Sequence, residues 1–378
     1  MRQIAELIAQ RRAGERSKPI LIVHIGGGKT GSSAIQTFLG RNRVQLAAQG
    51  IIVPDEQLGS GRGYGNQVFF FADLAQRADG AEILKAKLRV LVAERHVGRG
   101  TRHRPGEPSP VAIVLSAENL SNVGDQHHLF EGLSAEFDIA VLLYVRSQVS
   151  YYQAAWQQWH CKRGIERRQW LAQSAHLGDW LGAAERWSQI EPSALEVKVF
   201  ERSLLVGGDI VADFCATLRI DQISLLPNDE PVNEALGVHV SRLFEDVHHL
   251  FEDTHDNRIR DFLRALDIRS ARPRAGETLF TDEELCLIRE HHRERNKALK
   301  DRFLPDMGDA ELFSDFEAAL QYVDDAEITR RNQAVLFELL LKVSLLTEED
   351  PSGISTKSRG RGTRIPAIDR VRRWAFRS

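Results

Sequence analysis

Residues 22–38 read IVHIGGGKTGSSAIQTF, and this stretch decides which fold the sequence predicts. The apolar run at residues 19–25 is short, rich in β-branched side chains and followed at once by glycines, as in a buried parallel strand. Residues 32–48 then carry apolar side chains at roughly helical spacing. A short apolar piece at residues 50–53 completes a strand–loop–helix–strand unit.

The same alternation continues over the next part of the chain. Further strands are expected at residues 111–116, 138–146 and 195–201, and helices at residues 81–97, 149–162, 180–190 and 209–218. Strands separated by helices imply a parallel sheet with helices on both faces. The predicted fold class is therefore α/β, with a P-loop-like parallel sheet flanked by helices.

Beyond Pro231 the pattern changes to helices alone. They are expected at residues 233–251, 257–266, 282–303 and 328–346, with no further strand. We expect one α/β domain over residues 19–315, whose C-terminal helical lobe begins at about residue 232. An N-terminal surface helix precedes it at residues 1–18. A helical extension (residues 316–348) and a basic flexible tail (residues 349–378) follow.

Composition excludes several classes of protein. The formal net charge of −3 over 378 residues gives no overall attraction to nucleic acid, so any anion site must be local. Three separated cysteines form no CxxC pair, which argues against a disulfide scaffold and a zinc site. No apolar stretch is long enough to cross a membrane, and charges interrupt the N-terminal segment, unlike a signal peptide. A cytoplasmic location is expected.

The tail is the most basic part of the sequence. Its last 22 positions hold eight Lys or Arg and one Asp. Two interpretations stay open, a solvated basic segment and a segment that contacts a membrane surface weakly through Trp374 and Phe376.

The turn after the first strand suits an anion. Gly26, Gly27 and Gly28 allow a positive φ and a close approach of the backbone to a ligand. The N–H groups at the start of the next helix, with the positive end of its dipole, attract phosphate or sulfate. Lys29 adds a charge. Hydroxyl donors follow at Thr30, Ser32 and Ser33.

This turn is not a Walker A loop. That pattern requires G-x-x-x-x-G-K-[ST], and counting back from Lys29 puts Val23 where the first glycine should stand. The loop is therefore too short for a nucleoside triphosphate cradle of that type.

The segment HIGGGKTGSSAIQTFL instead resembles the 5′-phosphosulfate loop of sulfotransferases that use 3′-phosphoadenosine 5′-phosphosulfate (PAPS), in the version common among bacterial carbohydrate-type members. The resemblance extends more diffusely over residues 19–315. It implies PAPS as the donor co-substrate. It also implies that the ligands of the 5′-phosphosulfate are Gly28, Lys29, Thr30, Gly31, Ser32 and Ser33.

A second anchor is expected at the end of a later strand. The run at residues 138–146 ends in Arg146, which is aimed at the carboxyl edge of the sheet, where ligands of open α/β sheets bind. In the family that the chain resembles, this arginine binds the 3′-phosphate, with a serine about two helical turns later. Here Ala154 stands at that place, and Ser150, one turn earlier, is the substitute.

Sulfuryl transfer resembles phosphoryl transfer, in which positioning and charge stabilisation lower the barrier. Lys29 is expected to stabilise the leaving group, and Glu118, just beyond the strand at residues 111–116, is the first candidate for the general base. His24 is expected to be a core histidine. His127 and His128 are the third choice for the general base. Gln67 occupies a position where a histidine could have acted as the base, but an amide cannot. No metal is expected.

The acceptor is the least determined part of the prediction. The resemblance favours a glycan or glycoconjugate, with other small-molecule acceptors open. Aromatic side chains that could line an acceptor site or pack in the core are Tyr64, Trp156, Trp159, His160 and Trp170. Two other functions remain, a small-molecule P-loop kinase and a catalytically inactive nucleotide-binding module.

Overall fold

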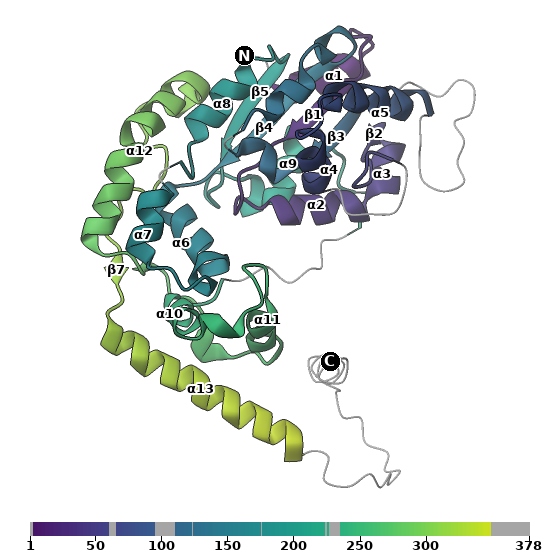
Figure 1. Cartoon of the computed structure of the whole chain (residues 1–378). Helices are drawn as coiled ribbons and strands as arrows, with labels where there is room; N and C mark the ends of the chain where they lie inside the picture. The colour runs from purple at the N-terminus through teal and green to yellow at the C-terminus, as the bar shows by residue number, and fades with distance from the viewer. Residues whose placement is uncertain are drawn as a thin grey trace, which may run out of the picture. The chain divides into compact units, whose positions relative to one another are not determined.

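The structure is a computed structural model of the chain that describes residues 3–59, 66–94, 110–122, 124–174, 176–223, 225–226 and 235–348 (Figure 1). The chain divides into two compact units. Unit 1 comprises Met1–Tyr151, His176–Glu230 and Ile288–Phe316, and unit 2 comprises Tyr152–Ala175, Pro231–Leu287 and Glu317–Ser378. The glycine-rich residues 60–65 with Tyr64, and the tail with Trp374 and Phe376, lie outside the described residues.

Unit 1 is built on a parallel sheet of five strands in the order β2-β3-β1-β4-β5. The strands are β1 (Ile20–His24), β2 (Ile51–Ile52), β3 (Ala112–Ser116), β4 (Asp138–Val145) and β5 (Ala194–Val199). Every residue of the three central strands is buried, which explains their continuous apolar sequences. The parallel α/β fold predicted from the sequence is confirmed.

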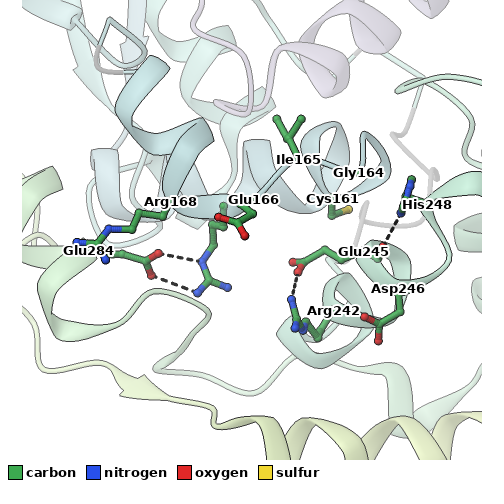
Figure 2. A pocket seen from close by; sticks show the side chains of 11 residues that line it. Cys161, Gly164, Ile165, Glu166, Arg168, Arg242, Glu245, Asp246, His248 and Glu284 are labelled. Carbon is green, nitrogen blue, oxygen red and sulfur yellow. Dashed lines mark hydrogen bonds and ion pairs between the residues drawn. The ribbon is translucent and has the colours of Figure 1, made fainter.

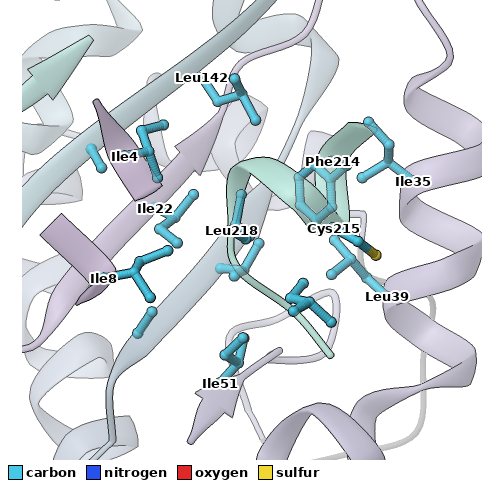
Figure 3. Packing of buried hydrophobic residues seen from close by; sticks show 14 of the residues in the cluster. Ile4, Ile8, Ile22, Ile35, Leu39, Ile51, Leu142, Phe214, Cys215 and Leu218 are labelled. Atoms are coloured by element: carbon cyan, nitrogen blue, oxygen red, sulfur yellow. The ribbon is translucent and has the colours of Figure 1, made fainter. Parts of the chain in front are cut away.

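One face of the sheet is covered by three helices, α1 (Ile4–Arg12), α2 (Ser32–Arg41) and α9 (Ile210–Thr217). Figure 3 shows their apolar side chains meeting those of the strands. Ile4 and Ile8 are fully buried, so α1 contributes its apolar face to the main core. The backbone N–H of Ile4 also donates to the Glu196 carboxylate of β5 at 3.1 Å, which fixes the start of α1.

The opposite face is packed against α8 (Trp180–Ser188), which contacts β4 and β5 but contributes no residue to the α1–α2–α9 core. Asp179 caps α8 by accepting from the N–H of Gly182 at 3.0 Å. Other α-helices that lie wholly within this unit are α3 (Arg43–Ala48), α4 (Val68–Leu74) and α5 (Gly80–Glu94).

The helix expected over residues 32–48 is interrupted at Asn42, which separates α2 from α3. The buried side chain of Asn42 donates to the carbonyl of Phe38 at 3.1 Å and accepts from the N–H of Leu226 at 2.7 Å. An asparagine that bonds nearby backbone competes with helix continuation, which accounts for the break.

Unit 2 is mainly helical. Its helices include α7 (Arg167–Gln173), α10 (Val238–Asp246), α11 (Arg258–Ala265) and α13 (Asp325–Glu348). The chain passes between the units within α6 (Gln148–Gln158) and α12 (Asp282–Phe303).

Unit 2 also corrects one prediction, because no strand was expected beyond Pro231. Strands β6 (Glu277–Thr278) and β7 (Gln321–Tyr322) pair in parallel. Each contains only two residues, too few to show a hydrophobic alternation in the sequence. Arg331 of α13 binds the Glu277 carboxylate at 2.7 Å, an ion pair in which both side chains are almost completely buried.

Among the described residues, no helix has both the length and the apolar character needed to span a membrane.

Candidate functional site

The loop after β1 forms a tight turn at the carboxyl edge of the sheet. The N–H and the hydroxyl of Thr30 both donate to the carbonyl of Gly27, at 3.3 and 2.6 Å. Helix α2 begins directly afterwards at Ser32, and its N-cap residue, Gly31, has no side chain to cap the first turn. The N–H groups of this turn therefore meet the expected condition for an anion site, an uncapped helix start.

The conformational role of the glycines differs from the prediction. Positive φ values occur at Lys29 (65°) and Gly31 (83°), not at residues 26–28. Glycine is needed at position 27 for space, because a Cβ there would lie 2.4 Å from the Trp180 ring. The sequence analysis therefore singled out the glycines correctly, but the reason at position 27 is the space beside Trp180 and not a positive φ.

A non-glycine residue with φ near 65° carries backbone strain that its surroundings must offset. Lys29 is such a residue, and its carbonyl accepts a hydrogen bond from Nη1 of Arg146 at 3.0 Å. Arg146 therefore contacts the loop directly and helps to hold its unusual conformation.

The strand that was expected to end at Arg146 ends at Val145, so Arg146 is the first residue after β4, and its neighbours fix it in place. Its Nε donates to Oγ of Ser150 at 2.8 Å, and Ser150 in turn donates to the carbonyl of Ser147 at 3.1 Å. The carbonyl of Arg146 accepts from Nε1 of Trp180 at 2.7 Å. The structure thus brings Lys29, Arg146 and Ser150 together, and the Ser150 hydroxyl accepts a hydrogen bond from the Arg146 guanidinium.

Arg146 keeps its positive charge at this edge. Burial lowers the pKa of Arg146 and the charge of Asp315 opposes that shift, but a guanidinium stays protonated in proteins. Among the residues that the structure describes, no carboxylate lies within 4.0 Å of the Arg146 guanidinium. An anion placed here would therefore meet a cation that no ion pair neutralises.

Glu118 lies at the same loop. It begins a 3-10 turn (Glu118–Ser121) immediately after β3, and its Oε2 accepts from the Ser32 hydroxyl at 2.7 Å. The Glu118 charge also contributes to raising the pKa of Tyr151 to about 12, after the larger effect of burial. The structure therefore places the first candidate base beside the first turn of α2. Because a hydroxyl has one proton, Ser32 cannot donate to Glu118 and to a ligand at once.

His24 is buried beneath the loop, in agreement with the prediction of a core histidine. Its Nδ1 lies 2.8 Å from the Ser116 hydroxyl, and its ring packs edge-on against Tyr144 and Phe214. Burial lowers its pKa to about 4, so it is neutral at pH 7. Its Nε2 has no hydrogen-bond partner and is directed at Gly26, where a Cβ would lie only 2.5 Å away.

The remaining sequence candidates have other roles or lie elsewhere. Gln67 is buried, and its Oε1 accepts from the N–H of Ser116 at 2.8 Å, which ties the segment before α4 to β3. Trp156 and Trp170 are buried in unit 2 with ring centroids 5.1 Å apart, so of the two interpretations core packing applies to them. Ser33 is exposed at the start of α2.

Two supporting contacts of the site were missed by the sequence analysis. Trp180 lies against Gly27 and binds the Arg146 carbonyl. The amides of Gln148 and Asn296 form two reciprocal hydrogen bonds of 2.8 Å, which join the first turn of α6 to α12. Neither contact has a local sequence signal, because each joins residues separated by long stretches of chain.

Unit 2 holds a separate pocket of about 390 Å³ (Figure 2). Charged side chains line it, and two of its arginines are paired with carboxylates. Arg242 lies 2.6 Å from Glu245, and Arg167 lies 3.3 Å from Glu284. Cys161 also lines it, but burial raises the pKa of this thiol to about 12, so it is not a reactive thiolate.

Comparison with known proteins gives little similarity. No protein-family model matches the chain, and no curated protein matches it. A solved structure, that of a sulfotransferase from Alicyclobacillus acidocaldarius, aligns with 65% of this chain and 97% of its own chain, at 15% sequence identity and a TM-score of 0.34. Values this low establish neither a shared fold nor a shared activity.

Proposed function

We propose that this chain is a sulfotransferase that moves the sulfuryl group of PAPS to a hydroxyl or amine of an acceptor. A glycan or glycoconjugate is the class of acceptor that the loop sequence favours. The observation that carries the proposal is the 3.0 Å hydrogen bond from Arg146 to the carbonyl of Lys29. It joins the two anion anchors, found separately in the sequence, at one edge of one sheet.

The residues at this edge fit a donor with phosphate groups at two positions. The uncapped start of α2 and Lys29 would bind the 5′-phosphosulfate, with Gly28, Thr30, Gly31, Ser32 and Ser33 as the other loop ligands. Arg146, held by Ser150, would bind the 3′-phosphate. Of these ligands, Ser32 must exchange its bond to Glu118 for a bond to the donor.

In the proposed step, the acceptor oxygen forms a bond to sulfur while the bond between sulfur and the bridging phosphate oxygen breaks. The electron pair of that bond leaves with adenosine 3′,5′-bisphosphate, and Lys29 stabilises the developing charge. Glu118 accepts the acceptor proton, because it lies beside the first turn of α2. Release of Glu118 from Ser32 when the donor binds would free the carboxylate oxygen for this proton transfer.

The proposal is tested first by binding. Thermal unfolding is followed with adenosine 3′,5′-bisphosphate, ATP and AMP, each with and without Mg²⁺. Stabilisation by the bisphosphate that does not depend on Mg²⁺ supports the proposal. Stabilisation by ATP that requires Mg²⁺ would identify a kinase-type site instead.

The second test is turnover. Transfer of radiolabelled sulfate from PAPS is measured against a panel of glycans, phenols and amines, with release of adenosine 3′,5′-bisphosphate as a readout independent of the acceptor. Labelled product and bisphosphate release together support the enzyme. Tight nucleotide binding with no bisphosphate release across the panel would indicate the inactive binding module.

A further inference from the structure

A cluster of metal-ligating side chains lies in unit 1, on the segment between β3 and β4. One carboxylate oxygen of Asp125 and one ring nitrogen each of His127 and His128 all lie within 4.8 Å of one another. Both histidines belong to a 3-10 turn (Gln126–Phe130), and their ring centroids are 4.0 Å apart. A search of the described residues for three or more His, Cys, Asp or Glu side chains with ligand atoms this close together finds this one group.

A second observation concerns the buried histidine of the cluster. His127 is only 3% exposed, and Nε2 of its ring lies 3.3 Å from Oε1 of Gln189. Since Oε1 can only accept, this contact places the proton on Nε2 and leaves the lone pair on Nδ1. That Nδ1 atom is buried and has no hydrogen-bond partner, a condition that costs stability unless a ligand uses it.

His128 is oriented in the complementary way. Its Nδ1 bonds to a carboxylate oxygen of Glu131, which leaves Nε2 as the atom able to bind a metal. Histidines that ligate metals commonly donate their other ring N–H to a carboxylate or an amide oxygen, which fixes the tautomer and the ring orientation. Both histidines of this cluster have such a partner.

We propose that Asp125, His127 and His128 form a binding site for a divalent transition-metal ion of the Zn²⁺ class. Two imidazoles and one carboxylate suit Zn²⁺, Co²⁺ or Ni²⁺ better than Ca²⁺ or Mg²⁺, which prefer oxygen ligands alone. Three protein ligands leave a coordination position for water.

The spacing requires only a small adjustment. Ligand atoms at about 2.1 Å from a tetrahedral ion stand about 3.4 Å apart, so separations up to 4.8 Å must shorten by about 1.4 Å at most. Asp125 and His128 are exposed, so their side chains can rotate towards a fixed His127.

This site shares no residue with the proposed PAPS site, and its test does not depend on sulfuryl transfer. The untagged 378-residue chain, with the exposed Cys286 replaced by Ser in every variant, is titrated with Co²⁺. Visible absorption reports the coordination geometry and calorimetry reports the stoichiometry. We expect one saturable Co²⁺ per chain, displaced by Zn²⁺.

The variants assign the ligands. Asp125→Ala and His128→Ala change exposed side chains and should each weaken Co²⁺ binding at least 10-fold. Glu131→Gln and Gln189→Ala should weaken it by about 10- to 100-fold, the usual cost of losing an orienting partner. The matched control is His248→Ala with His249→Ala, an adjacent and exposed histidine pair, which should bind Co²⁺ as the parent does.

Absence of saturable Co²⁺ and Zn²⁺ binding by the parent would overturn the proposal. Binding that survives both Asp125→Ala and His128→Ala, or that is lost only in the His248 and His249 control, would overturn it equally. Circular dichroism confirms that each variant is folded before its binding is interpreted.

Discussion

Arg146 at the loop edge of unit 1 and two arginines in the pocket of unit 2 have opposite kinds of partner. In the pocket, Arg242 and Arg167 are matched by Glu245 and Glu284. At the loop, Arg146 donates to a backbone carbonyl and to a serine hydroxyl, which leave its charge in place. Arginine content alone therefore does not identify an anion site. The partner of each guanidinium does.

The strongest test of this comparison is removal of the loop cation. Lys29→Ala should lower the rate of sulfuryl transfer by about 10²- to 10³-fold, because a preorganised charge at a developing anion contributes about 2.7–4 kcal/mol. The rate is measured as bisphosphate release from PAPS. Lys297→Ala is the control, since Lys297 is exposed on α12 and paired with Asp301. A Lys29→Ala rate within threefold of the parent would remove Lys29 from the chemistry.

The comparison can be sharpened in acid, since the histidine beneath the loop is buried while His248 of the pocket is exposed. The folded pKa of His24 is about 4, below the ordinary value of 6.5. Between these values the unfolded chain binds a proton that the folded chain does not, so stability is lost as pH falls from about 6.5 to 4. The loss from His24 approaches about 3 kcal/mol.

His24→Leu should therefore flatten the pH dependence of the free energy of unfolding over that interval relative to the parent. Urea unfolding at several pH values between 4.5 and 7.5 measures both slopes. An unchanged slope in His24→Leu would show that the folded chain does not hold the pKa of His24 below its ordinary value.

The third prediction compares Arg146 of the loop edge with Arg242 of the pocket. Arg146→Ala should weaken binding of adenosine 3′,5′-bisphosphate by about 10- to 100-fold, because hydrogen bonds to charged groups contribute about 1.5–3 kcal/mol. Arg242→Ala removes an arginine of the same kind that is already paired with Glu245, so it should leave this affinity unchanged. Calorimetry compares the two variants. Equal losses in both would mean that the pocket, and not the loop alone, attracts the nucleotide.

The sequence was sufficient to predict the positions of those residues at the loop edge that directly follow strands. A continuous apolar run predicted β4, and the residue after it, Arg146, had to lie at the carboxyl edge because the strands are parallel. The same argument placed the loop after β1 and Glu118 after β3. These positions follow from local periodicity and from the common direction of the strands.

The partners of those residues could not be predicted. Ser32 and Glu118 are separated by 86 positions, and nothing in either segment indicates that they are hydrogen-bonded. The positive φ at Lys29 was likewise missed, because lysine rarely adopts that conformation and the neighbouring glycines were the expected positions for it. Such contacts depend on how α2, β3 and β4 pack, which local periodicity does not encode.

Asp315 is another such long-range partner. Changing it should have the smallest effect of the four predictions on the charge environment of Arg146. This half-buried carboxylate acts on Arg146 by its charge, and its Oδ1 has no hydrogen-bond partner. Asp315→Asn should tighten bisphosphate binding by about two- to fivefold, since removing one charge interaction of this kind changes binding by about 0.4–1 kcal/mol. Asp301→Asn, at an exposed position of α12, is the control.

The direction of the Asp315→Asn effect distinguishes two roles for this carboxylate. If Asp315 only offsets the positive charge of the edge, the gain in affinity should shrink as salt screens the interaction. A loss of affinity would instead mean that Asp315 positions the guanidinium for the ligand, as Glu245 positions Arg242 in the pocket. The two arginine environments would then differ in degree and not in kind, and the unpaired charge of Arg146 would no longer mark the anion site.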